Sequence, residues 1–499
     1  MSEIYKFTNT GITVNIYNHG QGVRRTCFRS MVGTGGIEPP TSSVSRKRSP
    51  TELRACCLKS DNSIMSSQRS ARGNMRFIAD LHVHSPYSRA TSKEMELASL
   101  CKWAQIKGIT VVGTGDFTHP KWFSNLREKL EDAETGLFRL KPEYSSGIEN
   151  EVPQSCRSDV RFILSAEISC IYSKNGKTRK VHNLLFAPSF ESVQRINEAL
   201  SKIGNLKADG RPILGLDSKV LLRIALDASP DVMLIPAHAW TPHFSVFGSK
   251  SGFDTLEECF EELTPHVYAI ETGLSSDPQM NRRLSALDRI TLISNSDAHS
   301  PKKLAREANI FDTELSYQGI YNAIRKGDRS EFIGTIEFFP EEGKYHYDGH
   351  RSCKQRMTPS ETRLNNGLCP KCGDRVTVGV MSRVDTLADR KEDSTQAAAI
   401  PFKRTIPLHE IISEVCGVGV NSKTVENIYD KLTAPLGSEL SILSDVSISD
   451  ISDSGSPMLA EAVRRVRRGE VHIEAGYDGE FGTVRIFENA GSAKRGRGL

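Results

Sequence analysis

Nine side chains of the types that bind metal ions stand at or near the ends of short apolar stretches. They are His82, His84, Asp116, His119, Glu167, His182, His238, Asp297 and His299. Imidazole nitrogens together with carboxylate oxygens suit ions such as Zn2+ and Mn2+. Without cations, so many ionisable groups at one place would repel one another or lack partners. The set predicts a centre of two or three divalent ions: Zn2+, Mn2+ or Mg2+.

The spacing within the set supports a shared centre. Residues i and i+2 of a strand face the same way, so His82 and His84 can reach one cluster, as can Asp297 and His299. A carboxylate such as Glu167 can bridge two ions. A histidine alone at a strand end is usually a satisfied polar group, so the prediction rests on the whole set.

Such a centre suits phosphodiester hydrolysis by metal-activated water. Clustered cations neutralise phosphate oxygens, lower the pKa of water to about 7 and stabilise the leaving alkoxide. No serine, cysteine or lysine nucleophile is needed. We assign catalytic roles to Glu167, Asp297 and His299, with Asp297 or His299 orienting the water. His243 is a candidate substrate contact, and His266 receives no role.

An α/β barrel is the fold that would gather these side chains. From Met75 to about Phe339, short apolar runs such as RFIADLHVH alternate with amphipathic stretches, which is the α/β pattern. Barrel strands direct their carboxyl ends to one mouth, where active sites lie. The ligands at the strand ends would therefore meet there.

The bulk composition indicates a soluble, cytoplasmic chain. The 499 residues carry a net charge of only +4, so nucleic acid would have to be bound by local clusters. We find no apolar run long enough for a membrane span and no secretory signal. The eleven cysteines follow no disulfide spacing, which favours reduced thiols.

Residues 1–74 differ from the rest in lacking sustained periodicity. The stretch 31–56 resembles peptides translated from non-coding DNA. We expect a spurious or disordered extension without a packed core, and Met75, or else Met65, as the biological start. A genuine disordered basic arm is the alternative.

A second metal site is predicted within 341–400, a zinc module followed by a polar linker. His350, Cys353, Cys369 and Cys372 form H-x2-C-x15-C-x2-C, a spacing typical of structural zinc. His346 is the alternative fourth ligand. Four protein ligands leave no open position, so this Zn2+ should stabilise the fold instead of doing chemistry.

Beyond the ligands, three stretches resemble the endonuclease Q family of archaeal DNA-repair enzymes, within the PHP superfamily of polymerase and histidinol phosphatase domains. They are residues 114–120 (TGDFTHP), 237–260 and 271–309, and the resemblance spans about 75–487. It implies a distorted (β/α)7 barrel over 75–340, usually with three metals. Many PHP proteins have His directly after the second-motif Asp, whereas Phe117 follows Asp116 here, so His119 is the weakest ligand assignment.

The resemblance implies incision 5′ of uracil, hypoxanthine, xanthine or an abasic site, leaving 3′-hydroxyl and 5′-phosphate ends. In the stretch 237–260, we expect Trp240, Phe244, Phe247, Ser249 and Lys250 to form a loop that meets DNA; packing at the barrel rim is the alternative. A base extruded from the duplex would enter a pocket with aromatic walls.

The C-terminal segment 401–499 is predicted as an α+β domain that contacts DNA and ends in a disordered tail. Gly417 and Gly419 lie between two predicted helices, as in a helix–hairpin–helix element that offers backbone N–H groups to phosphate, with a plain helix–turn as the alternative. Arg464, Arg465, Arg467 and Arg468 form a candidate basic patch, with a solvated face as the alternative. Residues 471–487 read as a β-hairpin.

Two other functions remain open. A small-molecule phosphatase such as a histidinol-phosphate phosphatase could use the same barrel, but it would not need the zinc module or the arginine cluster. A non-catalytic scaffold would be expected to have lost ligands. A sliding clamp would be a fitting partner for a repair enzyme, although the sequence contains no clear clamp-binding peptide.

Overall fold

The computed structural model describes residues 5–8, 11–14, 74–391 and 399–488. Residues 1–61 and 62–499 are two separate units. In the first, β1 (Tyr5–Thr8) and β2 (Gly11–Val14) pair as an antiparallel hairpin, which the sequence pattern had not predicted. The rest of the expected N-terminal extension and the expected tail lie outside the described residues, as do residues 392–398 of the linker expected at 382–400. The first part of that linker is instead helical, within α11 (Val380–Leu387).

Strand pairing, one hydrogen bond and one bridge connect seven strands in a distorted ring, so the expectation of a mixed α/β barrel is confirmed. In ring order they are β3 (Met75–Asp80), β4 (Val111–Gly113), β7 (Arg161–Lys174), β8 (Lys177–Ala187), β10 (Met233–Pro236), β11 (Ala269–Glu271) and β12 (Thr291–Ile293). A hydrogen bond of 2.9 Å from Ala239 N, just beyond the end of β10, to Glu271 O, at the end of β11, joins these two strands. A parallel bridge between Val83 and Ala298 closes the ring.

Departures from a regular barrel explain its distortion. Strands β7 and β8 form a long antiparallel hairpin instead of two parallel strands joined by a helix. Outside the ring, β13 is antiparallel to both β3 and β14, and β17 adds to β14. The additional strands are β5 (Leu130–Asp132), β6 (Phe138–Leu140), β9 (Ile213–Leu214), β13 (Ala308–Thr313), β14 (Phe332–Glu337) and β17 (Phe402–Arg404).

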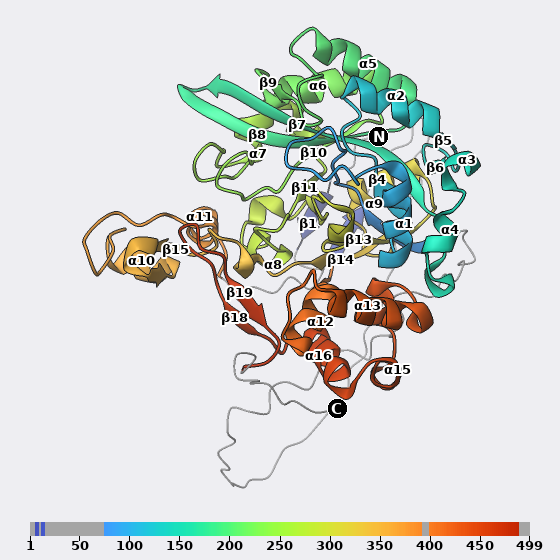
Figure 1. The fold of residues 1–499 in the computed structure, drawn as a ribbon. Helices are drawn as coiled ribbons and strands as arrows, with labels where there is room; N and C mark the ends of the chain where they lie inside the picture. Colours follow the sequence, from blue (N-terminus) through green and yellow to red (C-terminus); the bar gives the residue numbers. More distant parts are fainter. Residues whose placement is uncertain (1–4, 9–10, 15–73, 392–398, 489–499) are drawn as a thin grey trace, which may run out of the picture. The chain divides into compact units, whose positions relative to one another are not determined.

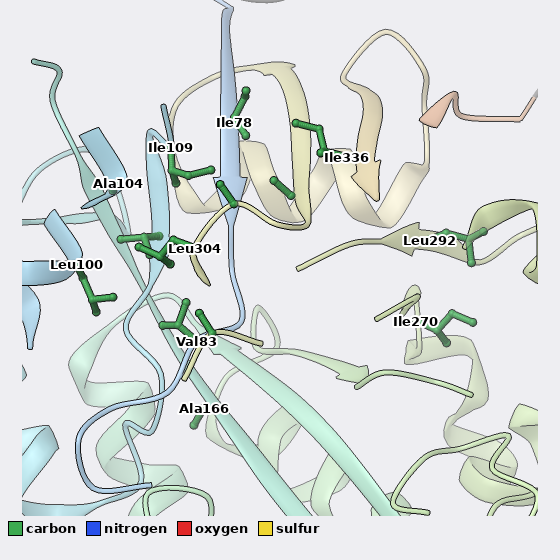
Figure 2. Close-up of a cluster of buried hydrophobic side chains, with 14 of the residues drawn as sticks. Ile78, Val83, Leu100, Ala104, Ile109, Ala166, Ile270, Leu292, Leu304 and Ile336 are labelled. Carbon is green, nitrogen blue, oxygen red and sulfur yellow. The ribbon is translucent and has the colours of Figure 1, made fainter. Parts of the chain in front are cut away.

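Side chains point alternately to the two faces of each strand, so the buried core has two parts. In β3, Phe77 and Ala79 belong to a cluster with residues of the other strands, whereas Ile78 belongs to the larger cluster with the outer helices. Figure 2 shows Ile78 and Ile109 in this larger cluster, which also contains Leu100 of α1. A barrel strand is therefore apolar on both faces, as expected for strands buried between a core and a helix layer.

Helices cover the outside of the barrel, and several of them begin at a residue whose side chain caps the first turn. Ser189, Asp217 and Ser316 each accept a hydrogen bond from the first turn of the helix that follows, which satisfies an otherwise unpaired N–H. The helices up to β14 are α1 (Leu97–Lys107), α2 (Pro120–Lys129), α3 (Pro142–Ser145), α4 (Ile148–Glu151), α5 (Phe190–Ser201), α6 (Ser218–Ala228), α7 (Leu256–Phe260), α8 (Pro278–Asn281) and α9 (Tyr317–Lys326). Short 3-10 helices lie at Gln154–Cys156, Glu261–His266, Ser285–Leu287, Pro301–Lys303, Pro340–Glu342 and Arg351–Cys353.

A small module follows the barrel. Its elements are β15 (Asp348–His350), β16 (Gln355–Met357), α10 (Pro359–Leu364) and α11 (Val380–Leu387). The strands β15 and β16 pair antiparallel. In Figure 1, α10 and β15 project to one side of the barrel.

The C-terminal segment consists of five helices followed by the expected hairpin. The elements are α12 (Leu408–Cys416), α13 (Lys423–Leu436), α14 (Glu439–Ser444), α15 (Ile448–Ser454), α16 (Pro457–Arg468), β18 (His472–Glu474) and β19 (Thr483–Arg485). The predicted helix pair is present as α12 and α13, with Gly417 at a φ of +64° ending α12. The segment predicted to begin a separate domain at 401 instead starts with β17, which joins the barrel sheet.

A buried ion pair fastens the helices of this segment to the barrel. Lys107 Nζ in α1 lies 2.6 Å from Glu439 Oε2 in α14, and both side chains are almost completely buried. Tyr429 Oη donates to the same carboxylate oxygen at 2.8 Å. With the lysine and tyrosine donors satisfying it, the Glu439 carboxylate can remain charged inside the structure.

Candidate metal centre

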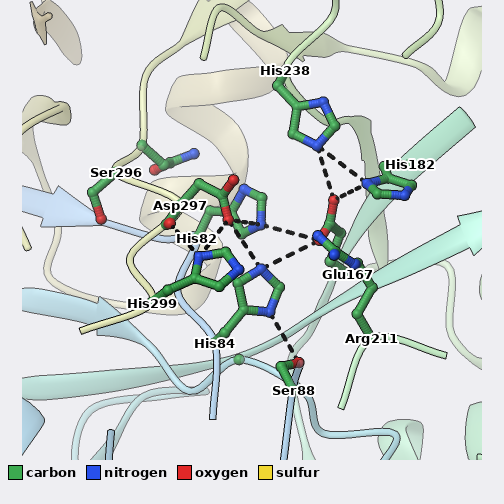
Figure 3. Close-up of polar contacts among 12 residues, drawn as sticks. His82, His84, Ser88, Glu167, His182, Arg211, His238, Ser296, Asp297 and His299 are labelled. Carbon is green, nitrogen blue, oxygen red and sulfur yellow. Dashed lines mark hydrogen bonds and ion pairs between the residues drawn. The ribbon is translucent and has the colours of Figure 1, made fainter. Parts of the chain in front are cut away.

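Two groups of potential metal ligands meet at the mouth of the barrel and share one residue (Figure 3). The first group comprises His82, His84, Glu167 and Asp297, and the second comprises Glu167, His182 and His238. Within each group the ligand atoms lie within 4.8 Å of one another. Six of the nine predicted ligands are thus brought together, and the arrangement fits a cluster of divalent cations.

Glu167 occupies the position of a bridging carboxylate. Its Oε1 lies 2.6 Å from His182 Nδ1 and 3.0 Å from His238 Nε2. Its Oε2 lies 3.3 Å from His84 Nε2 and 3.6 Å from His82 Nε2. Each oxygen faces a different set of imidazoles, as a carboxylate that binds two ions requires.

One buried atom supports the assignment of a metal site directly. His82 Nε2 is buried and has no hydrogen-bond partner, although it lies 3.5 Å from Asp297 Oδ1. Buried polar atoms of proteins are nearly always satisfied, so such an exception calls for an ion or a water. A cation between His82, Glu167 and Asp297 would satisfy it.

The backbone at the mouth is strained at three of the predicted ligands. Asp116, His238 and Asp297 have φ angles of +48°, +31° and +47°, in the left-handed region that side chains other than glycine rarely adopt. Such strain is concentrated at functional sites, where surrounding structure enforces it.

Carboxylates behind the centre orient two of its histidines. Glu271, which is fully buried, lies 3.0 Å from His82 Nδ1. Asp116 lies 3.1 Å from His84 Nδ1 and accepts from the backbone N and Oγ of Ser85 at 2.6 Å each. Engagement of Nδ1 leaves Nε2 directed at the centre. Asp116, expected as a ligand, therefore orients His84 in this structure.

Two other predicted ligands lie beside the groups instead of within them. The ring of His119 stacks on Tyr87 with centroids 4.2 Å apart, and burial lowers the pKa of His119. His299 Nδ1 lies 2.9 Å from the carbonyl oxygen of Asp297, and its ring centroid is 4.5 Å from that of His84. His299 can thus face a substrate at the barrel rim, whereas His119 packs against Tyr87 beside the centre.

Oppositely charged neighbours shift the pKa values of ionisable groups in the centre against the effect of burial. Burial opposes ionisation of Glu167, but His182 and Arg211 outweigh it and hold the pKa of that carboxyl well below its usual range. Burial likewise disfavours protonation of His82, yet Glu271 and Asp297 raise its pKa well above the ordinary value. A divalent ion would displace such protons on binding.

The four zinc ligands predicted after the barrel also come together. Ligand atoms of His350, Cys353, Cys369 and Cys372 lie within 4.8 Å of one another. The alternative ligand, His346, is buried elsewhere, at the wall of a cavity. The eight cysteines in the described ranges are all free thiols.

The predicted DNA loop divides into buried and exposed residues. Trp240 and Phe247 are 1% exposed and pack on each other, so the alternative of packing at the rim holds for these two. Phe244 is half-buried with its ring centroid 4.8 Å from that of His182. Ser249 and Lys250 are exposed. Phe244 and Lys250 are therefore the members of the set that remain close to the mouth and accessible.

The predicted arginine patch is largely paired within the protein. Arg464 and Arg465 both bind Glu461, at 2.7 Å and 2.9 Å. Arg467 donates to the carbonyl oxygens of Ile442, Leu443 and Val446. Arg468, whose side chain is 64% exposed, is left as the most accessible of the four, so the structure does not support a patch of four free cations.

A cavity of about 870 Å3 opens beside the metal centre. It lies between the barrel rim, the module and the C-terminal hairpin. His243 and Lys250 contribute from the barrel, Lys344 from the segment before the module, and Phe481 from the hairpin. Arg306 lines it and also donates to the carbonyl oxygens of Ser296 and Asp297.

Two residues of the centre were not singled out from the sequence. Glu271 ends the apolar run YAIE, so the strand-end pattern could have identified it. Arg211 donates to Glu167 from a loop, and no spacing pattern points to it. Within the described residues, no helix is both long and apolar enough to cross a bilayer.

Similarity to known proteins accords with this architecture. The MJ0043 C-terminal domain family matches residues 407–470. The uncharacterized protein MJ0043 of Methanocaldococcus jannaschii is 31% identical over 255 residues. The matched region is half of this chain but spans only 31% of the length of MJ0043. The uncharacterized protein YqxK of Bacillus subtilis is 26% identical over 82% of this chain and 99% of its own length.

Two solved structures match nearly throughout. The lesion-specific endonuclease PfuEndoQ from Pyrococcus furiosus is 30% identical, with a TM-score of 0.72, over 84% of this chain and 98% of its own. Endonuclease Q bound to a 27-mer duplex substrate with an abasic lesion at the active site is also 30% identical, with a TM-score of 0.70, over 84% and 99%. On these matches and on the expected motifs, the chain belongs to the endonuclease Q family.

Proposed function

We propose that this chain is a metal-dependent endonuclease that hydrolyses the phosphodiester 5′ of a deaminated base or an abasic site. The observation that carries the proposal is the pair of ligand groups joined by Glu167, with a large cavity beside them. The endonuclease Q structure with abasic duplex at its active site supports DNA as the substrate class.

Divalent ions held by the two groups would neutralise the phosphate, activate water and stabilise the leaving oxygen. Glu271 and Asp116 keep the imidazoles of His82 and His84 turned toward the centre. Asp297 and His299 have side chains 27% and 31% exposed, so both face the opening. These two residues would hydrogen-bond the attacking water and fix its direction.

The cavity beside the centre would receive the extruded nucleotide. Extrusion costs a few kcal/mol of stacking, which aromatic walls and edge hydrogen bonds recover. Phe338, Tyr345 and Phe481 supply aromatic surface, and Lys303 and Arg306 supply donors. Hypoxanthine and uracil present a carbonyl where adenine and cytosine present an amine, so a donor in the cavity would accept the damaged base and reject the normal one.

Glu342 is a further candidate donor in this cavity. Burial and the neighbouring carboxylate of Glu410 raise the pKa of Glu342 to about 8. At neutral pH its carboxyl group is therefore protonated and can donate a hydrogen bond to a carbonyl oxygen.

The Cys/His module would hold one structural Zn2+. His350, Cys353, Cys369 and Cys372 would bind it, and four protein ligands would leave no open position for substrate. Arg383 of α11 donates to Phe247 O at 2.9 Å and pairs with Asp254 at 2.6 Å, so the module is attached to the loop that follows β10. The ion would thereby keep one wall of the cavity in place.

The test is incision of end-labelled duplexes that carry uracil, hypoxanthine, xanthine or an abasic site, beside an undamaged duplex. We expect Mn2+- or Mg2+-dependent cutting 5′ of each lesion, abolished by chelation and by Glu167→Gln. Equal cutting of undamaged DNA, or full activity after exhaustive chelation, would contradict the proposal. Preferential hydrolysis of a small phosphomonoester would instead identify a phosphatase.

A further inference from the structure

Arg211 is the cation that contacts the bridging carboxylate. Its Nη1 donates to Glu167 Oε2 at 2.9 Å, and its side chain is 27% exposed. Figure 3 shows its guanidinium directed at Glu167, on the side from which His84 also approaches. The oxygen that Arg211 contacts is the one that belongs to the first ligand group.

The backbone around Arg211 is anchored on several sides. Its N–H donates to Asp209 Oδ1 at 3.2 Å, and Gly210 N donates to Tyr87 O at 3.0 Å. On the other side Ser169 N donates to Pro212 O at 3.0 Å, where β9 joins β7.

Gly210 allows this loop to lie close to the side chains at the barrel mouth. A Cβ at Gly210 would lie 2.3 Å from Asp116 Oδ2 and 2.4 Å from Ser88 Oγ, so no larger residue fits there. The backbone of the loop is therefore held against the barrel mouth, whereas the side chain of Arg211 is partly exposed.

Cations bound by both ligand groups would change the surroundings of Arg211. Glu167 would then share its charge with ions on each oxygen, and like charges would repel the guanidinium. Arg306, another arginine at this rim, already donates through Nε and Nη2 to the carbonyl oxygens of Ser296 and Asp297. Arg211 is thus the guanidinium that can exchange partners beside the reacting phosphate.

We propose that Arg211 alternates between two anions: the Glu167 carboxylate when the centre lacks metal, and a non-bridging oxygen of the scissile phosphodiester when metal and DNA are bound. This second role rests on the proposed function. A guanidinium suits both partners, because its planar array of donors matches carboxylate and phosphate alike. In the metal-free centre it neutralises Glu167, and in the loaded centre it positions the phosphate.

The first experiment measures Mn2+ binding to the metal-free full-length protein by competition with a chromogenic chelator. Removing a competing cation should tighten binding, so Arg211→Gln is expected to bind Mn2+ about tenfold more tightly, within the usual range of coupling between sites. Arg89→Gln is the matched control, because Arg89 pairs with Asp209 on the same loop but is 79% exposed. Unchanged or weaker Mn2+ binding by Arg211→Gln would overturn the counter-ion role.

The second experiment compares two uncleavable lesion duplexes in the presence of Mn2+. One has a methylene group in place of the leaving 3′-oxygen and keeps the phosphate charge; the other has a neutral methylphosphonate at the scissile position. Fluorescence anisotropy should show that wild type and Arg89→Gln bind the charged duplex about tenfold better. Arg211→Gln should show a clearly smaller preference, since only Mn2+ then favours the charged phosphate, and Arg211→Lys should retain more of it.

The outcomes separate this inference from the proposed function. An Arg211→Gln variant that prefers the charged duplex as strongly as wild type does would overturn the phosphate contact. Failure of wild type to cut any lesion duplex would overturn the proposed function, yet the Mn2+ measurement would still test the exchange at Glu167. Circular dichroism on each variant shows whether a change in binding reflects lost folding.

Discussion

His82 Nδ1 lies 3.0 Å from a carboxylate oxygen of Glu271, and both side chains are buried. The contact fixes the imidazole so that Nε2, which has no hydrogen-bond partner, points toward Glu167 and Asp297. Glu271 also accepts from His238 N at 2.8 Å, so one carboxylate arranges residues of both ligand groups.

Glu271→Gln should therefore weaken metal binding without removing a ligand. Loss of a partner behind a metal-binding histidine typically reduces affinity by about 10- to 100-fold, and we expect a loss in this range. Equilibrium dialysis against Mn2+ measures it, with the exposed Glu257→Gln as control. An affinity equal to that of the control would mean that Glu271 does not organise the centre.

The strand-end pattern predicted the centre because barrel geometry brings strand ends together whatever lies between them. His82, Glu167 and Asp297 met as expected. The pattern did not distinguish a ligand from the carboxylate behind it. Asp116 and Glu271 both end apolar runs, and their roles depend on the direction of a side chain, which strand spacing does not specify.

Local sequence also bears on two groups of predicted DNA contacts. Glu461 precedes Arg464 by three residues and Arg465 by four, a spacing at which helical side chains pair, and both pairs form. Trp240 and Phe247 lie in a Gly- and Ser-rich stretch typical of a surface loop, yet they are buried. Tertiary packing determines whether such residues are buried. It also brings Arg211, which lies in a loop far from Glu167 in sequence, into contact with that carboxylate.

Removal of a thiolate from the Cys/His module should affect folding more than chemistry. Cys369→Ala is expected to lose one Zn2+ per chain and to lower the melting temperature, because a structural zinc site contributes binding free energy to the folded state. Metal analysis and a thermal unfolding scan measure both effects, and Cys416→Ala, a free thiol outside the module, is the control. If Cys369→Ala kept its full zinc content, these four residues would not be the site.

Replacing Arg467 should destabilise the fold, whereas replacing its neighbour Arg468 should have almost no effect on stability. Arg467 donates to three carbonyl oxygens at the end of α14, and hydrogen bonds from charged groups contribute about 1.5–3 kcal/mol. Arg467→Gln should therefore lower the free energy of unfolding by about 1.5–3 kcal/mol in urea titrations. Arg468→Gln, at an exposed position, should change it by less than about 0.5 kcal/mol. Equal losses in the two variants would show that the carbonyl contacts do not stabilise the fold.

Glu337 should make stability fall as pH rises. Burial and the nearby Asp277 raise the pKa of this carboxyl from 4.5 to about 8, against hydrogen bonds from Thr335 and Thr272 that lower it. Between these two values the folded protein holds a proton that the unfolded chain releases. Unfolding is then linked to proton loss, so the free energy of unfolding decreases between about pH 4.5 and pH 8.

Glu337→Gln cannot release this proton, so its stability should vary less over the same pH window. Because one pKa unit corresponds to about 1.4 kcal/mol, the variant should gain on the order of a few kcal/mol over wild type at the alkaline end. Urea titrations at several pH values measure the difference, with Glu257→Gln expected to follow wild type. Since burial also raises the pKa of Glu307, part of the slope should persist in the variant. A profile in Glu337→Gln as steep as that of wild type would mean that Glu337 is not the group that titrates.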